Sequence, residues 1–360
     1  MILLNPGPVN VTERVRKALC QEDICHREEE FSGLLQGIRR KLLEAFAPDG
    51  SYTAIALTGS GTAAVEAAIS CCLDQSSKLL VINNGIYGER MALMAAAYGM
   101  NVVELKSPWE EGLDILRLEE TLRREPSIQV VAMVHHETTT GMLNPVREVG
   151  KLTGRYGKKL LVDSVSGLGG ETLDLSASGG REGVDMCIGT AGKCIQGFPG
   201  VSFILIRRTE MERIQKIRPR SLYLYLPDHF RDQERGTVPF TPAVQLYYAL
   251  DEALAELLEE GVDQRIARYR EAANLLRGGF VKLGLQFLLR KGLRSNTITS
   301  LYLPKGVSYK ELHDGLKRRG YVIYAGQGLL QSNIFRVANM GALKRSDFEG
   351  FLHHLEEVIK

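Results

Sequence analysis

Hydrophobic runs alternate with amphipathic segments from about residue 50 to residue 206. The runs are short and rich in β-branched residues, which is typical of buried strands, and most intervening segments have helical periodicity. Strands are predicted at 53–57, 79–83, 101–105, 128–134, 159–163, 185–189 and 201–206, with helices at 61–72, 114–124 and 146–156. This alternation predicts an α/β domain built on a mostly parallel, seven-stranded sheet.

After Pro242 the pattern changes to long stretches of helical periodicity. Helices are predicted at 243–259 and 263–283 on either side of Gly261, and the rest mixes strands at 297–303, 321–324 and 333–337 with helices at 308–319 and 345–358. Such a mixture predicts a small α+β domain. We therefore divide the chain into an N-terminal arm (1–15), a large domain (16–260) and a small C-terminal domain (261–360).

The charge balance argues against several classes of protein. The chain has 45 basic and 43 acidic side chains, a net charge of +2, and no long run of either sign, so we expect neither a nucleic-acid nor a membrane partner.

No apolar stretch approaches the ~18 residues that span a bilayer, and the N-terminus lacks the apolar core of a signal peptide. The six cysteines lack the paired spacing of a zinc site. We expect a soluble, cytoplasmic protein with free thiols and no metal.

Lys193 is the strongest candidate for chemistry. It comes just after the strand 185–189, among glycines that permit tight turns, so its side chain is predicted to point into the ligand crevice at the carboxyl edge of the sheet. Asp163 ends the strand 159–163 and reaches the same crevice. The alternatives are a solvated surface lysine and an aspartate that only caps the following turn.

The turn from Gly59 to Thr62 follows a strand and opens a helix. Backbone N–H groups and hydroxyls at a helix N-terminus bind anions, so this turn is a candidate phosphate site. Its glycines also match a dinucleotide-binding fingerprint, which makes an NAD-dependent enzyme the competing interpretation. That fingerprint expects an acidic residue about twenty positions later, and the chain has Asn83 and Asn84 at the corresponding strand end. The dinucleotide interpretation therefore loses most of its weight.

Further polar and aromatic residues follow neighbouring strands. Tyr87 follows the strand 79–83, where its ring can lie against an aromatic cofactor; the alternative is a buried core tyrosine. The threonine-rich run 137–141 supplies hydroxyl groups at the crevice. His135 and His136 have no carboxylate or cysteine at ligand spacing, so they are predicted to be core or supporting residues rather than metal ligands.

Three stretches carry a resemblance to a known family: Met-Val-His-His-Glu-Thr-Thr-Thr-Gly-Met-Leu-Asn-Pro (133–145), Lys-Cys-Ile-Gln-Gly-Phe-Pro-Gly (193–200) and Arg-Ser-Leu (220–222). With them the sequence resembles the class V aminotransferases, which depend on pyridoxal 5'-phosphate (PLP) and have fold type I of the PLP-dependent transferases. The resemblance runs from Asn5-Pro6-Gly7-Pro8 to Phe335-Arg336-Val337. Within class V it is strongest to the transaminases that use 2-aminoethylphosphonate and pyruvate.

The resemblance implies a role for each candidate residue. Lys193 would carry the cofactor as a Schiff base and act as the catalytic base, and Asp163 would pair with the pyridine nitrogen. Tyr87 and Val165 would enclose the ring. The remaining cofactor-binding residues that it implies are Thr138 beside the ring hydroxyl, and Ser60, Gly61, Thr62 and Thr190 at the phosphate.

The resemblance also implies a homodimer with its active sites at the subunit interface, where Thr241 would reach the phosphate site of the other subunit. Arg336 would bind the acid group of the substrate. The N-terminal arm would lie at the active site, with Gly7 next to the substrate. Arg220 is a candidate helper for the substrate anion, and a structural ion pair is the alternative.

The expected reaction transfers an amino group from a small-molecule donor to a keto acid acceptor, giving phosphonoacetaldehyde and alanine from 2-aminoethylphosphonate and pyruvate. A transaminase of the alanine–glyoxylate or serine–pyruvate type is the alternative. A PLP-dependent lyase is less favoured, because cysteine desulfurases of this fold need a reactive cysteine near the small domain and no cysteine follows Cys194. A non-catalytic PLP-binding protein would lack the lysine or the aspartate.

Overall fold

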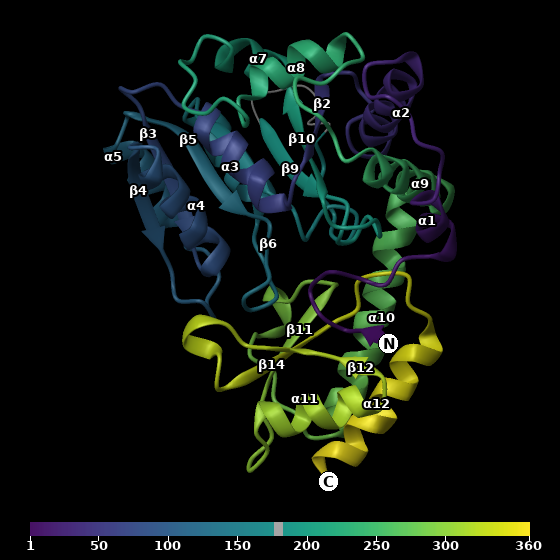
Figure 1. The fold of residues 1–360 in the computed structure, drawn as a ribbon. Coiled ribbons are helices and arrows are strands. Elements are labelled where there is room, and N and C mark those ends of the chain that lie inside the picture. Colours follow the sequence, from purple (N-terminus) through teal and green to yellow (C-terminus); the bar gives the residue numbers. More distant parts are fainter. Residues whose placement is uncertain (176–182) are drawn as a thin grey trace.

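A seven-stranded sheet forms the centre of the larger lobe, as the computed structural model shows for residues 1–175 and 183–360 (Figure 1). In spatial order the strands are β2 (Tyr52–Thr58), β10 (Val201–Arg207), β9 (Met186–Thr190), β8 (Lys159–Asp163), β5 (Ile128–Val134), β3 (Lys78–Asn83) and β4 (Asn101–Lys106). β10 runs antiparallel to both of its neighbours, whereas every other pairing in this sheet is parallel. The predicted mostly parallel, seven-stranded sheet is therefore confirmed.

The alternation of side chains along the strands builds a hydrophobic core on each face of the sheet. Leu79 of β3 faces the layer that contains α3 (Gly61–Cys71) and α4 (Ile86–Ala97), whereas Leu80 faces the opposite layer. That opposite layer contains α2 (Glu29–Phe46), α5 (Ile115–Arg124), α6 (Val146–Arg155) and α9 (Val244–Glu260). Because both faces are covered, the inner strands are buried along nearly their whole length, which explains their continuous hydrophobic sequences.

Several shorter elements complete the larger lobe. They are the helices α1 (Glu13–Ala18), α7 (Arg208–Ile214) and α8 (Leu226–Glu234) and a hairpin of β6 (His136–Glu137) and β7 (Met142–Leu143). The hairpin extends from the carboxyl edge of the sheet towards the smaller lobe (Figure 1). Residues that follow β5 are thereby carried into the region between the two lobes.

The C-terminal residues form the smaller lobe around a three-stranded antiparallel sheet (Figure 1). Its elements are β11 (Ile298–Tyr302), β14 (Ile334–Ala338) and β13 (Tyr324–Ala325), the helices α10 (Val262–Lys282), α11 (Tyr309–Arg318) and α12 (Arg345–Ile359), and short 3-10 turns at Lys291–Leu293 and Gly328–Leu330. The start of the chain joins this lobe, because β1 (Ile2–Leu3) pairs with β12 (Tyr321–Val322) and Leu4 is buried in the same core.

The single strand predicted at 321–324 is wrong. Tyr321 and Val322 pair with β1, whereas Tyr324 and Ala325 pair with β14, so two sheets share this segment. Ile323 between them is fully buried, so the hydrophobic run reflects burial. A strand that changes its partner sheet keeps the same hydrophobic pattern, which is why the sequence does not reveal the change.

Gly261 separates α9 from α10. Its φ of 86° lies in the region that favours glycine, and the chain turns there between two long helices. α10 then runs from the larger lobe into the smaller one (Figure 1). The division into an arm (1–15), a large domain (16–260) and a small domain (261–360) remains our proposal. In the described part of the chain, we find no helix with the length and apolar character needed to cross a membrane.

Candidate active site

Lys193 lies in the turn after β9, at the carboxyl edge of the parallel strands. Its Nζ donates a hydrogen bond to the carbonyl oxygen of Pro6 in the N-terminal arm. Burial lowers the pKa of Lys193 to about 8, although the negative charge of Asp163 acts in the opposite direction. At mildly alkaline pH a large fraction of this amine is therefore neutral, the form that attacks carbonyl groups and accepts protons.

The N-terminal arm approaches this amine closely. Gly7 has a φ of 107°, and a Cβ atom at this position would lie 2.5 Å from Lys193 Nζ. Only glycine satisfies both the backbone conformation and the close approach. The structure thus brings Gly7 to the lysine, while a contact between Gly7 and a substrate stays a prediction.

Gln196 fixes the backbone that follows the lysine. Its φ of 66° is unusual for a residue with a side chain. Its Nε2 donates hydrogen bonds to the hydroxyl of Tyr269 at 2.6 Å and to the carbonyl oxygen of Gly341 at 2.9 Å. Both partners belong to the C-terminal part of the chain, so contacts from beyond the sheet hold the lysine turn in place.

Asp163 ends β8 and is buried beside the lysine turn. Its Oδ1 accepts a hydrogen bond from the Val165 N–H at 3.0 Å, and no described residue donates to its Oδ2. Burial raises the pKa of Asp163 to about 6, while the Val165 N–H and the positive charges of Arg90 and Lys193 act to lower it. A buried carboxylate with one free oxygen is suited to an N–H group of a bound ligand.

The N-terminus of α3 is open. Ser60 is the residue at the start of the helix, yet its hydroxyl makes no hydrogen bond to the helix and the residue is exposed. The unpaired N–H groups of a first helical turn carry partial positive charge. Arg90 adds a full positive charge beside them, because its Nη1 donates to Thr62 Oγ1 at 3.3 Å. This arrangement is suited to an anion.

Tyr87 and Val165 both line a small cavity of about 30 Å³ next to Asp163. The guanidinium carbon of Arg90 lies 4.7 Å from the centre of the Tyr87 ring, a cation–π contact between residues one turn apart on α4. Val165 contacts the start of α3 so closely that a Cβ at Gly61 would be 2.7 Å from its side chain. Tyr87 and Val165, the two residues predicted to enclose the ring, therefore line the same cavity.

Arg336 is almost fully buried on β14 of the smaller lobe. Its Nε donates to the carbonyl of Ala325 at 2.8 Å, and its Nη1 donates to the carbonyl of Thr138 at 2.8 Å and to Gln327 Oε1 at 3.1 Å. Burial lowers the pKa of Arg336. No hydrogen bond from Nη2 to a described residue is present, so one end of a rigidly held guanidinium remains available for an anion.

The other predicted threonines occupy different places. Thr190 Oγ1 donates to the carbonyl of Val201 at 3.1 Å, which is a bond within the sheet. Thr241 is exposed, in the segment whose Ala243 N–H donates to Thr58 Oγ1 at 3.1 Å, beside the turn that leads to α3. Neither hydroxyl contacts Lys193 or Asp163 in this chain, and the cofactor roles of both threonines stay predictions.

Arg220 lies away from the candidate site. Its Nη1 donates to the carbonyls of Leu73 at 2.6 Å and Ser70 at 3.2 Å, at the C-terminal end of α3, whereas the candidate site is at the N-terminal end. A guanidinium there pairs carbonyl groups that the helix leaves free and complements the helix dipole. The predicted substrate-binding role of Arg220 stays a prediction, and in this chain the side chain acts as a helix cap.

His135 and His136 are buried behind the site. Burial lowers the pKa of His135 to about 4 and that of His136 to about 3, so both rings are neutral at physiological pH. Nδ1 of His135 lies 3.0 Å from Ser164 Oγ, and Nδ1 of His136 lies 3.3 Å from the carbonyl of Ser166. These contacts tie the start of the hairpin to the loop that follows Asp163.

Sequence reasoning missed two residues of the site, Arg90 and Glu137. Arg90 is three residues after Tyr87, so a helix predicted at this point would have placed both on one face. Glu137 binds the backbone at the start of α4 from a distance of fifty residues in the sequence. No local pattern predicts such a contact.

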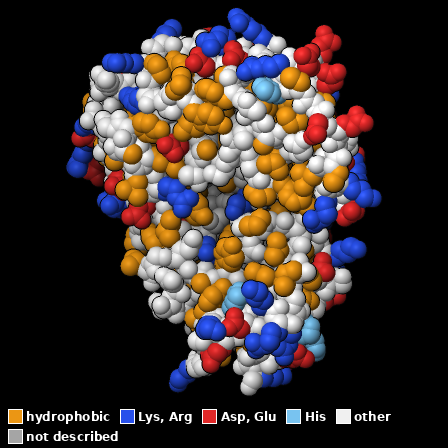
Figure 2. Space-filling view, in the orientation of Figure 1, with side chains coloured by type: hydrophobic (Ala, Val, Ile, Leu, Met, Phe, Trp, Pro, Cys, Tyr) orange, Lys and Arg blue, Asp and Glu red, His pale blue; other side chains and the backbone are white. Residues whose placement is uncertain are grey.

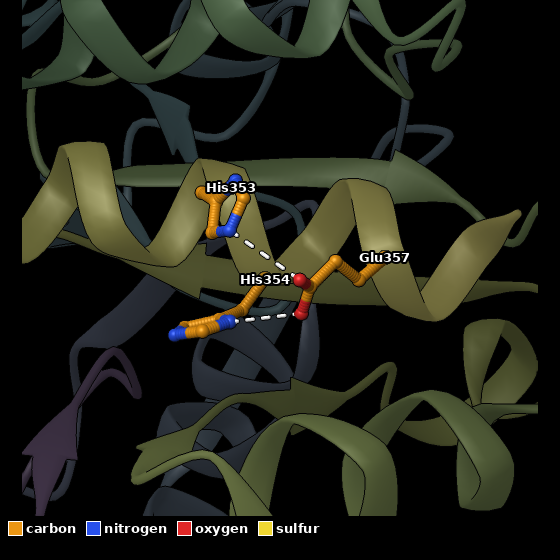
Figure 3. A group of neighbouring side chains, drawn as sticks. All are labelled: His353, His354 and Glu357. Atoms are coloured by element: carbon orange, nitrogen blue, oxygen red, sulfur yellow. Dashed lines mark hydrogen bonds and ion pairs between the residues drawn. The ribbon is translucent and has the colours of Figure 1, made fainter.

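A second group of polar side chains lies on the surface of α12, away from this site. His353, His354 and Glu357 point towards one another (Figure 3). His353 Nε2 and His354 Nδ1 lie 3.3 Å and 3.0 Å from the carboxylate of Glu357, and Arg319 Nε is 3.1 Å from the same carboxylate. Because an arginine already neutralises Glu357, the group is an exposed Arg–Glu ion pair with two neighbouring imidazole rings.

The residues around Lys193 fit PLP group by group. The aldehyde needs an amine, which Lys193 supplies in partly neutral form, and the pyridine nitrogen needs a carboxylate, for which Asp163 has a free oxygen. The phosphate needs donors, and the open N-terminus of α3 supplies them beside Arg90. A hollow bordered by basic side chains lies between the two lobes on the face shown in Figure 2. The donor set therefore suits an anionic, aromatic aldehyde.

Comparisons with known proteins agree with this chemistry. The family model for class V aminotransferases matches residues 14–348. The 2-aminoethylphosphonate–pyruvate transaminase of Syntrophobacter fumaroxidans is 39% identical over 364 residues, covering 100% of this chain and 95% of that protein. Among solved structures, the alanine–glyoxylate aminotransferase of a Nostoc species has a TM-score of 0.93 with 28% identity, covering 100% of this chain and 95% of the other. A subgroup IV aspartate aminotransferase of Thermus thermophilus has a TM-score of 0.91 with 28% identity, covering 100% and 99%.

The fold, the chemistry of the lysine site and the family model lead to the same result. Fold type I of the PLP-dependent transferases is confirmed by the two solved structures. The chain belongs to the class V aminotransferases, a family of PLP-dependent transferases.

Proposed function

We propose that this class V transaminase transfers the amino group of 2-aminoethylphosphonate to pyruvate, giving phosphonoacetaldehyde and alanine, with PLP bound at Lys193. The observation that carries the choice of substrate is the 39% identity, along the whole chain, to a transaminase named for these two substrates. The buried lysine with its lowered pKa, next to a half-free carboxylate and an open helix N-terminus, supports the chemistry.

In this proposal each residue acts on a defined atom. When bound, PLP supplies an electron sink for the negative charge that develops on the reacting carbon of the substrate. Lys193 Nζ is the nucleophile that holds the cofactor and the base that moves the proton from the substrate carbon. Asp163 keeps the pyridine nitrogen protonated through its free oxygen. Tyr87 and Val165 hold the ring from its two sides.

The rest of the cofactor site binds the phosphate. Ser60, Gly61 and Thr62 contribute N–H and hydroxyl donors from the start of α3. Arg90 adds positive charge beside Thr62 and lies against the Tyr87 ring. Thr138 and Thr190 complete the proposed set, the first beside the ring hydroxyl and the second beside the phosphate.

Arg336 is proposed to bind the anionic group of both substrates. A planar guanidinium grips a carboxylate or a phosphonate with parallel hydrogen bonds, and the free Nη2 leaves one edge for this purpose. Its two other nitrogens are fixed by protein acceptors, so the group is held in position before a substrate arrives. The N-terminal arm with Gly7 covers the same space next to Lys193.

A homodimer with active sites at the subunit interface also belongs to this proposal. Leu222 and Tyr223 are large exposed hydrophobic residues, with 78% and 42% of their surfaces accessible. Tyr223 hydroxyl donates to the carbonyl of Thr58 at 3.3 Å, so this apolar surface adjoins the turn that leads to α3. Exposed Thr241 lies beside the same turn. A second subunit docked here would cover the surface and bring residues next to the phosphate site.

A donor competition tests the proposed substrate. The PLP-loaded enzyme is mixed with 2-aminoethylphosphonate, alanine or serine in separate reactions, and the loss of the absorbance band of lysine-bound cofactor is followed. We expect the phosphonate donor to be at least tenfold more efficient, about 1.4 kcal/mol in transition-state binding. If alanine with glyoxylate outperforms 2-aminoethylphosphonate with pyruvate, the alanine–glyoxylate type of class V transaminase replaces this proposal.

A further inference from the structure

We propose that Glu137 is a positioning residue that ties Tyr87 and Arg336 to one three-residue turn. The turn 137–139 begins at the last residue of β6 and leads into the loop of the hairpin between the two lobes. One side of the turn binds the first turn of α4, and the other side binds the guanidinium of Arg336. The inference rests on the proposed function, in which Tyr87 contacts the cofactor ring and Arg336 the substrate anion.

Glu137 and Thr139 close the N-terminus of α4. Glu137 Oε2 accepts hydrogen bonds from the N–H groups of Tyr87 at 3.2 Å and Gly88 at 3.3 Å. Thr139 Oγ1 accepts from the N–H of Ile86 at 3.1 Å. A Cβ at Gly85 would lie 2.3 Å from the Glu137 carboxyl carbon, so glycine is required for this approach. The backbone that carries the Tyr87 ring is therefore held by a side chain from another strand.

The contacts of Glu137 require a carboxylate. Its Oε1 accepts from the Thr139 N–H at 3.0 Å and from the Thr139 hydroxyl at 2.5 Å. All four of its partners are donors, so both oxygens must act as acceptors. The residue is fully buried, and water cannot replace a lost partner. Glutamine has the same shape, but its NH2 group would face two of the donors.

The other side of the turn holds the arginine. The carbonyl of Thr138, between the two capping residues, accepts the 2.8 Å hydrogen bond from Arg336 Nη1. A shift of the turn therefore changes the position of the Tyr87 backbone and of the Arg336 guanidinium together. Replacing a residue that only stabilises the fold would not specifically move the Tyr87 backbone or the Arg336 guanidinium.

The test compares Glu137→Gln with a matched control, Glu210→Gln. Glu210 is also fully buried, but it pairs with Arg213 on α7, away from the site. Hydrogen exchange of the apo-protein reports the amides of residues 86–88, titration with PLP reports cofactor affinity, and visible circular dichroism reports the setting of the bound cofactor. Steady-state kinetics with a donor and an acceptor separates kcat from KM.

We expect Glu137→Gln to speed exchange at 86–88 and to weaken PLP binding, each at least tenfold, to change the dichroism of the bound cofactor, and to raise KM for both substrates. Glu210→Gln should lower the melting temperature and leave the other readouts unchanged. Thr139→Val, which removes one cap hydroxyl, should give smaller effects in the same direction and serves if Glu137→Gln fails to fold. Unchanged exchange and PLP affinity in both site variants would overturn the proposal. If the wild-type protein does not bind PLP, the proposed function fails, whereas the exchange data still report the cap.

Discussion

Two successive strand–helix connections of the large sheet begin alike and end differently. β2 leads to α3 through Gly59 and Ser60, and β3 leads to α4 through a turn that ends at Gly85. At α4 the first N–H groups are bound by Glu137 and Thr139, whereas at α3 the Ser60 hydroxyl makes no bond to the helix. The protein closes one helix N-terminus with its own carboxylate and leaves the other open.

Two buried carboxylates near these helices differ in the same way. Both oxygens of Glu137 accept hydrogen bonds, whereas only Oδ1 of Asp163 has a partner among the described residues. An unpaired polar group costs free energy inside a protein, so it is retained where a ligand pairs with it. The open start of α3 and the unpaired oxygen of Asp163 border the same small cavity as Tyr87, and the satisfied groups around Glu137 hold the backbone of Tyr87.

Among the groups proposed to bind the cofactor, Lys193 is expected to give the largest effect when it is replaced by alanine. We expect PLP to stay bound without a covalent bond, through Asp163 and the start of α3, while turnover falls by roughly three orders of magnitude or more because the catalytic amine is lost. Absorbance after dialysis and steady-state rates measure the two effects. In the wild type, borohydride reduction and peptide mapping should find the cofactor on Lys193, and a label on another lysine would contradict the assignment.

Asp163→Asn tests the carboxylate with the free oxygen. An amide keeps the shape but cannot hold the pyridine nitrogen protonated, so turnover should fall roughly 100-fold while PLP affinity changes by less than about tenfold. Equilibrium titration with PLP and single-turnover kinetics separate binding from chemistry. Unchanged turnover would remove Asp163 from its proposed role.

The pH dependence of apo-protein stability tests the same group without a cofactor. The pKa of Asp163 is raised to about 6, so between about pH 4 and pH 6 the folded state binds more protons than the unfolded state. Stability contributed by this group is therefore lost as pH rises through that window. The stability of Asp163→Asn relative to wild type should increase over it by on the order of 3 kcal/mol and level off above about pH 7, as urea unfolding would measure. An unchanged difference would mean that Asp163 is solvated in the apo-protein.

Arg336→Lys tests the arginine that the turn 137–139 holds in place through the Thr138 carbonyl. A lysine cannot reproduce the planar fork, so both half-reactions should slow by about tenfold, about 1.4 kcal/mol. Arg277→Lys is a matched control, because Arg277 is a half-buried arginine that, in the described part of the chain, donates hydrogen bonds to Thr299, Ser295 and Ile298. The control should reduce stability without changing either half-reaction. An effect on one half-reaction alone would show that the two substrate anions bind at different places.

The smallest effect is expected for Ser60→Ala, and it tests the comparison most directly. Because the hydroxyl makes no bond to α3, its loss should change the free energy of unfolding by less than about 0.5 kcal/mol. PLP affinity should fall about threefold, the value of one hydrogen bond. Thermal melting of the apo-protein and PLP titration measure these changes. A large loss of apo-protein stability would mean that Ser60 caps the helix after all.

The sequence predicts Lys193 and Asp163, which are proposed to meet the ligand, better than it predicts the contacts of Glu137, which cap α4. Lys193 follows a hydrophobic run and Asp163 ends another, so both could be assigned to the carboxyl edge before the strand order was known. The contact between Glu137 and Tyr87 depends on β5 lying next to β3. Strand order is a tertiary property, and local patterns of hydrophobic residues do not encode it.

Arg90 and Arg220 show two further limits of local sequence patterns. Arg90 was missed because no helix was predicted at 86–97, where small and hydrophobic residues occur on all sides and give little amphipathic contrast. Arg220 was assigned to the substrate because it belongs to a stretch shared with the family. In the folded chain its guanidinium binds carbonyls at the far end of α3. A shared stretch does not indicate which neighbour a side chain contacts.

The antiparallel strand β10 sets a length inside the site. Its start lies between the two functional turns, since the Gly59 N–H donates to the carbonyl of Gly200 at 2.8 Å and the Ala191 N–H donates to the carbonyl of Val201 at 3.0 Å. Neighbouring strands are about 4.8 Å apart, so this insertion separates the turn after β2 from the turn after β9 by roughly 10 Å. A ligand must span that width to meet an amine at one end and the start of α3 at the other. The spacing that β10 imposes is therefore suited to an elongated ligand whose anion and reactive carbon lie at opposite ends.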